Sequence, residues 1–313
     1  MSENILVIKL GALGDFIQAA ASFAAIRTHH HRSRITLLTT APFAEFAVKS
    51  PWFDDVWVDQ RPKSYDLAGW LGLRSRLRRG EFTRVYDLQT SRRTGRYFKL
   101  FWPGPPPDWS GIARGCTLPH DNPMRNFMHT VERQAEQLVM AGLSAPSAPD
   151  FSWVRGDISR FNFQERFVIL APGGAPHRHA KRWPVRSYRA LAMELAATGL
   201  QPVVVGSARE LSLGEEVLAG CEIGRNLAGQ TNLEDLFLLA RDAHSAVGND
   251  TGPMHIFATQ GCRTLVLYSG VSDPALCAQR GDTVKILRRE HLQDLTATDV
   301  VMALSTVNSG ASS

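Results

Sequence analysis

Three polar turns, each following an apolar run, carry residue types that could bind phosphate or move a proton. The first is Gly11-Ala12-Leu13-Gly14-Asp15, the second is Ala171–Pro184, and the third is Asp250-Thr251-Gly252-Pro253-Met254-His255. In an open α/β sheet, ligands bind beyond the carboxyl ends of the strands. Polar turns at those ends are therefore the first candidates for chemistry.

The turn at Asp250 is typical of a buried strand that ends in a tight corner and continues as a helix. Pro253 suits the first helical position, because its fixed φ matches the helix and its missing N–H is not needed there. The free N–H groups of such a first turn favour an anion. The same pattern also fits a capped helix start without a ligand, and the turn alone does not decide between the two.

The turn Ala171–Pro184 places a Gly-Gly pair before a dense group of cations and histidines. Such a loop at a strand end indicates phosphate binding rather than a solvated basic loop, although the Walker A spacing is absent. Beside the Asp250 turn it would suit a diphosphate, with lysine and helix dipoles in place of a metal ion. No His, Cys or Asp cluster has metal-ligand spacing, so we expect no metal and no resident cofactor.

Asp15, at the end of the first turn, has two interpretations. At the edge of a cleft its carboxylate could act as a general base. At the start of a helix it could instead be an N-capping residue, and the local pattern favours this cap. The turn lacks the GxGxxG fingerprint, so a nicotinamide cofactor is not indicated.

The positive charge of the chain is concentrated in its first half. The formal net charge is +5, yet Arg61–Arg114 holds 12 Lys or Arg against 4 Asp or Glu. Such an excess indicates an acidic partner: a phosphorylated or carboxylated substrate, an anionic membrane or nucleic acid. Nucleic acid is disfavoured, because the region lacks an aromatic-interleaved motif of the RNP type.

Two features of this basic region could meet an acidic partner. Arg92, Arg93 and Arg96 could grip phosphates or carboxylates, or they could belong to a solvated loop. The predicted helix Leu67–Arg79 mixes apolar residues with arginines. It could rest on an anionic membrane, although its spacing favours packing into its own domain.

Length and composition indicate a large globular protein. The 313 residues, 44% of them hydrophobic, can bury a core sufficient for two domains. No window approaches the apolar length of a membrane span, and the N-terminus lacks the layout of a signal peptide. The four cysteines are far apart and form no CxxC pair. These features predict a cytoplasmic protein.

Strand-like and helix-like segments alternate through both halves, which predicts parallel sheets with helices on both faces. The predicted strands are Ile5–Leu10, Ile35–Thr40, Asp55–Val58, Arg84–Leu88, Phe167–Leu170, Pro202–Val205, Ser245–Val247 and Thr264–Tyr268. The predicted helices are Phe16–Arg27, Phe43–Lys49, Leu67–Arg79, Arg125–Met140, Val185–Thr198, Glu210–Leu218, Leu233–Ala240, Met254–Thr259 and Thr298–Leu304. A linker at Leu143–Pro149 would separate domains over residues 1–145 and 146–313, facing each other across a cleft.

The order of three motifs resembles a known enzyme family. Gly-x-x-Gly-Asp at Gly11–Asp15, Lys-x-Trp-Pro at Lys181–Pro184 and Asp-Thr-Gly-x-x-His at Asp250–His255 are similar to those of the bacterial ADP-heptose:lipopolysaccharide heptosyltransferases, glycosyltransferase family nine. The resemblance runs from about Ile5 to about Leu287. It implies the GT-B fold, with a Rossmann-like acceptor-binding domain followed by a Rossmann-like domain that binds the nucleotide sugar.

The resemblance also implies a role for each matching residue. Asp15 matches the catalytic base, Lys181 the lysine that holds the donor phosphates, and Asp250 the acidic residue near the donor sugar. The other donor-site matches are Thr251, Gly252 and His255 at the diphosphate, Glu210 at the ribose, Thr231 at the adenine and His177 near the phosphates. The chain departs from the family at Gln18, Ala21 and Ser269–Pro274, which bears on the acceptor rather than the donor.

The implied function is inverting, metal-independent transfer of heptose from ADP-heptose to a lipid A-linked, acidic inner-core acceptor of lipopolysaccharide. The implied location is the cytoplasm, with peripheral contact to an anionic membrane left open. Two alternatives remain. One is a GT-B enzyme for another nucleotide sugar or acceptor; the other is an ADP-binding module without transfer activity, in which Asp15 is only a helix cap.

Overall fold

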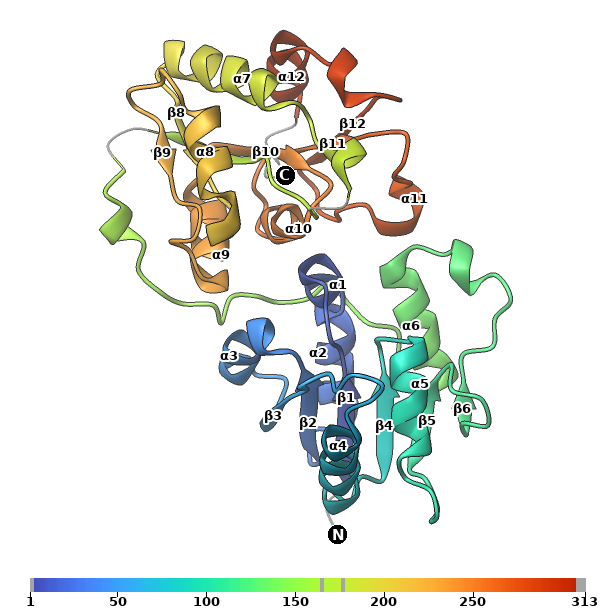
Figure 1. Ribbon diagram of the computed structural model, residues 1–313. Helices are drawn as coiled ribbons and strands as arrows, with labels where there is room; N and C mark the ends of the chain where they lie inside the picture. Colours follow the sequence, from blue (N-terminus) through green and yellow to red (C-terminus); the bar gives the residue numbers. More distant parts are fainter. Residues whose placement is uncertain (1–2, 164–165, 176–177, 308–313) are drawn as a thin grey trace. The chain divides into compact units, whose positions relative to one another are not determined.

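The computed structural model describes residues 3–163, 166–175 and 178–307 of the chain. The chain divides into two compact units, Met1–Trp153 and Val154–Ser313, each built around one parallel sheet (Figure 1). No helix in the described part of the chain is both long and apolar enough to cross a bilayer.

The division between the units lies C-terminal to the predicted linker Leu143–Pro149. Phe151 and Trp153 stay with the first unit, because their rings pack against Trp52 with centroids 5.8 and 5.5 Å away. The segment that looked like a free linker in sequence is therefore followed by aromatic anchors.

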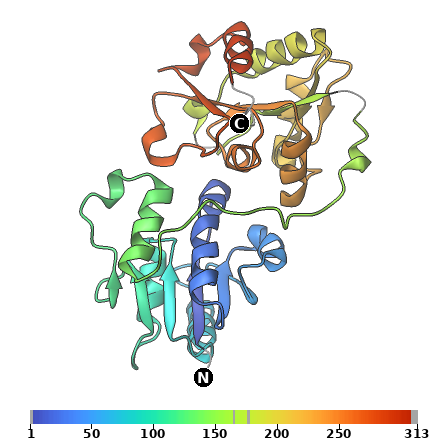
Figure 2. The ribbon, with the colours of Figure 1, turned by 180° about the vertical axis from the view of Figure 1, so that it is seen from behind.

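The first unit is a doubly wound sheet with the strand order β3-β2-β1-β4-β5-β6. Its parallel strands are β1 (Asn4–Ile8), β2 (Arg34–Thr39), β3 (Asp55–Val58), β4 (Arg84–Asp87), β5 (Asp108–Gly111) and β6 (Leu118–Pro119). Its helices are α1 (Leu13–Gln18), α2 (Ala20–His29), α3 (Ala41–Lys49), α4 (Leu67–Arg79), α5 (Arg92–Lys99) and α6 (Thr130–Met140). Helices α4 and α5 cover one face (Figure 1), whereas α2 and α6 cover the other (Figure 2).

The second unit repeats this topology, with the strand order β12-β11-β10-β7-β8-β9. Its parallel strands are β7 (Phe167–Ala171), β8 (Gln201–Val204), β9 (Arg225–Asn226), β10 (Ser245–Asn249), β11 (Thr264–Tyr268) and β12 (Val284–Arg288). Its helices are α7 (Val185–Ala197), α8 (Leu211–Val217), α9 (Leu233–Asp242), α10 (Gly252–Thr259), α11 (Pro274–Cys277) and α12 (Ala297–Ser305). Helix α7 packs against α8 and α12, and α10 packs against α9.

The central strands are buried on both faces, as parallel strands between two helical layers must be. Every residue of β7 and β10 is buried, as are Ile5–Ile8 of β1. These strands could be predicted from the sequence because both of their faces require apolar side chains. The predicted α/β class with two doubly wound domains is confirmed.

Two predicted helices are divided in the structure. The prediction Phe16–Arg27 covers parts of both α1 and α2, because the Ala19 amide donates to Phe16 O at 3.2 Å and tightens the turn between them. The prediction Arg125–Met140 was also wrong as one helix. A 3-10 turn at Arg125–Phe127 is followed by extended backbone at Met128, and α6 begins at Thr130.

Candidate functional site

Each sheet has one switch point, where the strand order changes direction: between β1 and β4 in the first unit, and between β7 and β10 in the second. Loops diverge at a switch point and leave a crevice beyond the strand ends. The turn containing Asp15 follows β1. The Ala171–Pro184 turn follows β7 and the Asp250 turn follows β10, so these two lie on neighbouring strands of one sheet.

Lys181 and Asp250 form an ion pair at the switch point of the second unit. The distance from Lys181 Nζ to Asp250 Oδ2 is 2.7 Å, and the two side chains are 17% and 8% exposed. Burial alone would raise the pKa of the Asp250 carboxyl, but the hydrogen bond and charge of Lys181 hold that pKa below its ordinary value. Asp250 is therefore a stable carboxylate beside a fixed cation.

Asp250 is also held by residues near the end of the sheet. Ser272 Oγ donates to its Oδ2 at 3.1 Å, and Gln279 Nε2 donates to its Oδ1 at 3.4 Å. Gln279 Nε2 also lies 3.3 Å from Nε2 of the buried His255, while its Oε1 accepts from Tyr268 at 3.0 Å. His255 thus joins the Asp250 corner through Gln279, which the sequence motifs did not include.

Asn249, the last residue of β10, fastens the Ala171–Pro184 turn to the sheet. Its Nδ2 donates to Pro172 O at 2.7 Å and Gly173 O at 3.1 Å. Its Oδ1 accepts from the Trp183 amide at 3.0 Å and the Tyr188 hydroxyl at 3.1 Å. The residue is fully buried. Its only sequence signal was a polar residue at the end of an apolar run.

Glu210 connects the same turn to the loop after β8. Its Oε1 accepts the Gly174 amide at 3.0 Å, and its Oε2 accepts the Ser207 amide at 2.7 Å. A Cβ on Gly173 would collide with the Glu210 carboxylate, so a larger residue at this position would displace that side chain. Glu210 thus lies beside the Gly-Gly pair, with both carboxylate oxygens engaged by the protein.

Arg182 adds a second cation at the Gly-Gly pair. Its Nη2 donates to Gly174 O at 2.6 Å, whereas its buried Nε has no hydrogen-bond partner in the described part of the chain. A buried N–H without a partner carries a desolvation cost. This group is therefore available to an anionic oxygen that enters the turn.

Helix α10 begins at Gly252, with Thr251 as its N-cap residue. Pro253 is the second helical residue rather than the first, so the predicted position was wrong by one residue. Its missing N–H is harmless at the first or the second position, because N–H groups of the first turn have no partner within the helix. The Thr251 hydroxyl donates to Asn249 O at 3.2 Å and does not cap the helix. In the first turn of α10, Pro253 has no N–H and the Met254 amide donates to Thr251 O at 3.2 Å, so the Gly252 N–H is the group next to Asp250 that remains for a ligand.

Two further predicted donor residues, Thr231 and His177, take no part in the contacts described above. Thr231 is half-buried in the loop between β9 and α9, next to the α9 N-cap Asn232. His177 lies outside the residues that the structure describes.

Asp15 is the third residue of α1 and not its N-cap, which is Ala12. The interpretation of Asp15 as the capping residue itself was therefore wrong by position, although its Oδ2 accepts the Ala12 amide at 3.2 Å. The residue is half-buried. One carboxylate oxygen steadies the turn, and the group remains in reach of solvent and ligands.

Lys9 and Asp87 lie buried at the switch point of the first unit, at the ends of β1 and β4. Lys9 Nζ donates to Leu88 O at 3.1 Å, and Asp87 Oδ1 accepts the Thr90 amide at 3.0 Å. Burial lowers the pKa of Lys9 to about 8, against the opposing charge of Asp15. Burial raises the pKa of Asp87 to about 6. Both were missed as site residues, although Lys9 was the one charge in an apolar run.

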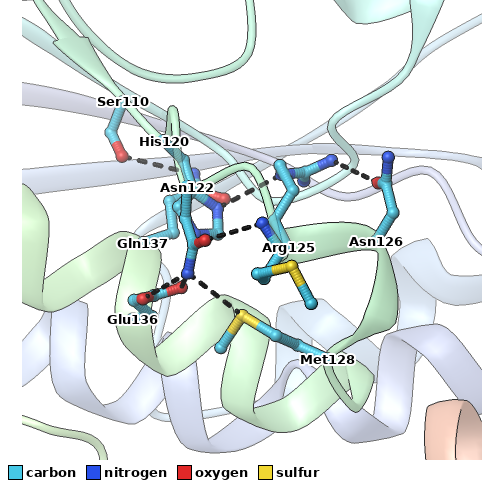
Figure 3. Close-up of polar contacts among 9 residues, drawn as sticks. Ser110, His120, Asn122, Arg125, Asn126, Met128, Glu136 and Gln137 are labelled. Carbon is cyan, nitrogen blue, oxygen red and sulfur yellow. Dashed lines mark hydrogen bonds and ion pairs between the residues drawn. The ribbon is translucent and has the colours of Figure 1, made fainter.

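Arg125 belongs to a polar network that links the loop after β6 to α6 (Figure 3). Its Nε donates to His120 Nδ1 at 3.5 Å, which leaves His120 Nε2 to donate to Glu136 Oε2 at 2.9 Å. The His120 hydrogen bond lowers the pKa of Glu136. Asn122 Nδ2 donates to both Glu136 oxygens, at 2.8 and 2.9 Å. The network fastens the loop after β6 to α6 and fixes the position of the Arg125 side chain.

The guanidinium of Arg125 is incompletely satisfied. Its Nη2 is buried without a hydrogen-bond partner among the described residues. Burial lowers the pKa of Arg125, and the charge of Arg133 lowers it further. Arg133 also acts on Lys9. We call Lys9, Arg125 and Arg133 the basic cluster; the acids near it are Asp15, Asp87 and, through His120, Glu136.

The three arginines predicted to bind an acceptor lie on α5. Arg92 and Arg96 are exposed. Arg93 Nη1 donates to Pro62 O at 3.2 Å, and its guanidinium lies over the Trp70 ring, 5.9 Å from the centroid. Arg93 therefore contributes to the packing of α5 against α4, while Arg92 and Arg96 remain open to solvent.

Residue types that bind metals do not gather into a site in the described part of the chain. No group of three or more His, Cys, Asp or Glu side chains there could hold a metal ion. The charged groups around the Gly-Gly pair are instead Lys181, Arg182, Glu210 and Asp250. They can position a phosphate between fixed cations and the Gly252 N–H.

Solved structures share this architecture across both units. Heptosyltransferase II from E. coli has a TM-score of 0.79 at 22% identity, covering 98% of each chain. A glycosyltransferase family 9 protein from Veillonella parvula has a TM-score of 0.83 at 18% identity, covering 97% of each chain. At these identities the likeness concerns the fold, and it confirms the predicted GT-B class.

Similarity in sequence is found over a shorter stretch. Lipopolysaccharide heptosyltransferase 2 of Salmonella typhimurium is 37% identical over 129 residues, which are 40% of this chain and 37% of the relative. The E. coli protein of the same name is 36% identical over the same shares. The match thus spans little more than a third of the length of these curated relatives. The family model for glycosyltransferase family 9 (heptosyltransferase) matches residues 70–303. The chain therefore belongs to glycosyltransferase family 9, the heptosyltransferase family.

Proposed function

We propose that the protein is an inverting, metal-independent glycosyltransferase that moves heptose from ADP-heptose to an acidic inner-core acceptor of lipopolysaccharide. The observation that carries the proposal is the Lys181–Asp250 ion pair beside the Gly-Gly turn at the second switch point. Two solved structures of one relative support the donor: E. coli heptosyltransferase WaaC with ADP, and the same enzyme with ADP-2-deoxy-2-fluoro heptose. The acceptor is lipid-linked, so we place the protein in the cytoplasm at the membrane surface.

The second unit would bind the donor. Lys181, the Nε of Arg182 and the Gly252 N–H at the start of α10 offer positive charge to a diphosphate. These fixed groups can stabilise the charge that develops as the diphosphate departs, which is the task a metal ion performs elsewhere. Asp250 would orient the sugar, Glu210 the ribose and Thr231 the adenine, with Thr251, Gly252, His255 and His177 around the phosphates.

The first unit would bind the acceptor. Asp15 would take the proton from the acceptor hydroxyl, whose oxygen then attacks the anomeric carbon. The bond from that carbon to the phosphate oxygen breaks, and ADP leaves with the electron pair. Lys9 of the basic cluster follows the same strand as Asp15, and the buried Nη2 of Arg125 has no hydrogen-bond partner among the described residues. The basic cluster would bind a carboxylate or phosphate of the acceptor, with Arg92, Arg93 and Arg96 as further candidates on α5.

The decisive experiment measures transfer and ADP binding separately in Asp15→Asn and Lys181→Ala. We expect Asp15→Asn to lower kcat by about 10²- to 10⁴-fold with unchanged ADP affinity, because only the proton acceptor is lost. Lys181→Ala should weaken ADP binding by about tenfold or more, because a charge-assisted hydrogen bond is lost. Lys49→Ala, on α3 and paired with Glu45 at 2.9 Å, is the control for loss of a lysine.

The outcomes separate the alternatives. Full transfer by Asp15→Asn would remove the base assignment, and unchanged ADP affinity in Lys181→Ala would remove the phosphate role. ADP binding without turnover of any nucleotide sugar would indicate a binding module. Turnover with a different donor in a nucleotide-sugar panel would keep the reaction class and change the substrate. Transfer that stops on addition of EDTA would contradict metal independence.

A further inference from the structure

Large apolar side chains lie exposed on the α4 side of the first unit. Trp102 is 76% exposed, and Leu67 and Leu71 of α4 are 74% and 62% exposed. Single exposed leucines are ordinary, but an exposed tryptophan in a loop bonded to a helix with two exposed leucines calls for a physical reason. The packing role predicted for α4 is met by other residues, because Leu77 is buried and Trp70 packs against Tyr97.

These apolar residues form one surface with two cations. Leu67, Leu71 and Arg78 lie on one stripe of α4, since they are separated by four and seven residues. Arg74 joins the helix to the neighbouring loop, because its Nη2 donates to Trp102 O at 3.0 Å. Lys99 and Trp102 line one open pocket of about 390 Å³ with Phe98, Gly104 and Pro106. We call Leu67, Leu71, Arg78, Lys99 and Trp102 the α4–Trp102 surface.

Acidic residues are nearly absent from the sequence around this surface. From Leu67 to Pro107 the chain holds nine Lys or Arg and only two acids, Glu81 and the buried Asp87. Asp66, just before α4, is used as its N-cap and accepts the Gly69 amide at 2.8 Å. A second copy of this basic face would be repelled, whereas anionic lipid headgroups would be attracted. A surface that combines arginine and lysine with exposed leucine and tryptophan has the composition of a segment that binds at the membrane interface.

We propose that the α4–Trp102 surface binds an anionic phospholipid bilayer, with Trp102, Leu67 and Leu71 at the headgroup boundary and Arg78 and Lys99 on the phosphates. This inference deepens the proposed function and rests on it for its purpose, since a lipid-linked acceptor is reached at a membrane. The surface is built from α4, the last residue of α5 and the loop after α5, and it contains no residue assigned to the donor or the acceptor.

The test is co-sedimentation of the full chain with phosphatidylglycerol-containing vesicles and with pure phosphatidylcholine vesicles. Binding should require phosphatidylglycerol and weaken as salt rises. Trp102→Ala should lower vesicle affinity by about tenfold, because most of a buried aromatic contact is lost. Arg78→Gln/Lys99→Gln should lower it by about 25-fold, close to fivefold for each charge. Arg32→Gln/Arg166→Gln removes the same charge elsewhere and should leave binding unchanged.

Several outcomes would overturn the inference. One is equal loss of binding in the Arg32/Arg166 control, which would mean that net charge alone attracts the protein. A second is stronger displacement by inorganic phosphate than by chloride at equal ionic strength, which would indicate a site for a single phosphate. A third is a dimer that dissociates on Trp102→Ala. Vesicle binding without any glycosyl transfer would refute the proposed function alone, and transfer to a water-soluble acceptor should be unchanged in both surface variants.

Discussion

Replacing Asn249 with alanine should cost more stability than its size suggests, because one amide joins four groups. The side chain is fully buried and hydrogen-bonds Pro172 O, Gly173 O, the Trp183 amide and the Tyr188 hydroxyl. Alanine would leave all four without that partner. The Tyr188 hydroxyl would retain only Ala171 O, at 3.4 Å.

The expected magnitude follows from these four bonds. Each contributes about 1 kcal/mol net, and a buried group left unsatisfied costs about 1–3 kcal/mol. Some groups will recover a partner through relaxation or water, so Asn249→Ala should lower the free energy of unfolding by about 3–5 kcal/mol. Because the lost bonds fix the turn that carries Lys181, ADP affinity should fall as well.

Urea unfolding of the full chain, with ADP binding measured on the folded variant, checks this prediction. Tyr188→Phe removes one of the four partners and should cost about 1 kcal/mol. Asn249→Asp keeps the accepting oxygen but sets a carboxylate against two carbonyl groups, so it should be at least as damaging as alanine. A cost below about 1 kcal/mol for Asn249→Ala, or equal costs for Asn249→Ala and Tyr188→Phe, would refute the idea that this amide holds the turn.

Two further changes test the electrostatics and the packing of the switch points. Asp87→Asn should stabilise the protein near neutral pH: burial raises the pKa of Asp87 from 3.8 to about 6, so ionising it in the fold costs about 3 kcal/mol. The wild-type stability from this group is present below 3.8 and lost as pH rises through about 6, so melting curves should converge in acid; a gain that persists there would contradict the cause. Gly173→Ala should weaken ADP binding by about tenfold by displacing Glu210 from the Gly174 amide. Gly95→Ala on α5 is its control, since a Cβ there would meet no atom within 4 Å; equal effects would argue against the Glu210 contact.

The strands with the clearest sequence pattern are those buried on both faces, where apolar side chains are required. Strands β1, β7, β10 and β11 are buried on both faces and read as continuous apolar runs. Four strands were missed: β6 and β9 are only two residues long, β5 contains polar residues, and β12 contains Lys285 and Arg288. Helix α5 was missed because its sequence, RRTGRYFK, resembles a basic loop. Burial alone does not decide the outcome, because β3 is half-buried along its length and was predicted with its exact bounds, whereas the mostly buried β5 was missed.

The candidate site divides in the same way. Glycine, proline and aspartate cluster locally at the turns, so Asp15, Lys181 and Asp250 stood out in sequence. The residues that position them come from distant segments: Gln279 is 29 residues from Asp250, and Asn249 is 77 from Pro172. Neither has a local signal that separates it from any other polar residue. Only the strand order of the sheet brings Asn249 and Gln279 to the site residues, so these supporting contacts could not be predicted from the motifs.

The two switch points treat charge in opposite ways, and this difference bears on which ligand each would receive. In the second unit Lys181 and Asp250 neutralise each other, so an entering diphosphate would meet a preformed pair with Arg182 and α10 to spare. In the first unit Lys9 is buried against a backbone carbonyl, and its pKa falls to about 8. Arg125 and Arg133 add charge without a matching carboxylate in contact among the described residues. An acidic acceptor would supply the missing negative charge and hold Lys9 protonated, so under the proposed function acceptor affinity should fall as pH rises through about 8 while ADP affinity does not.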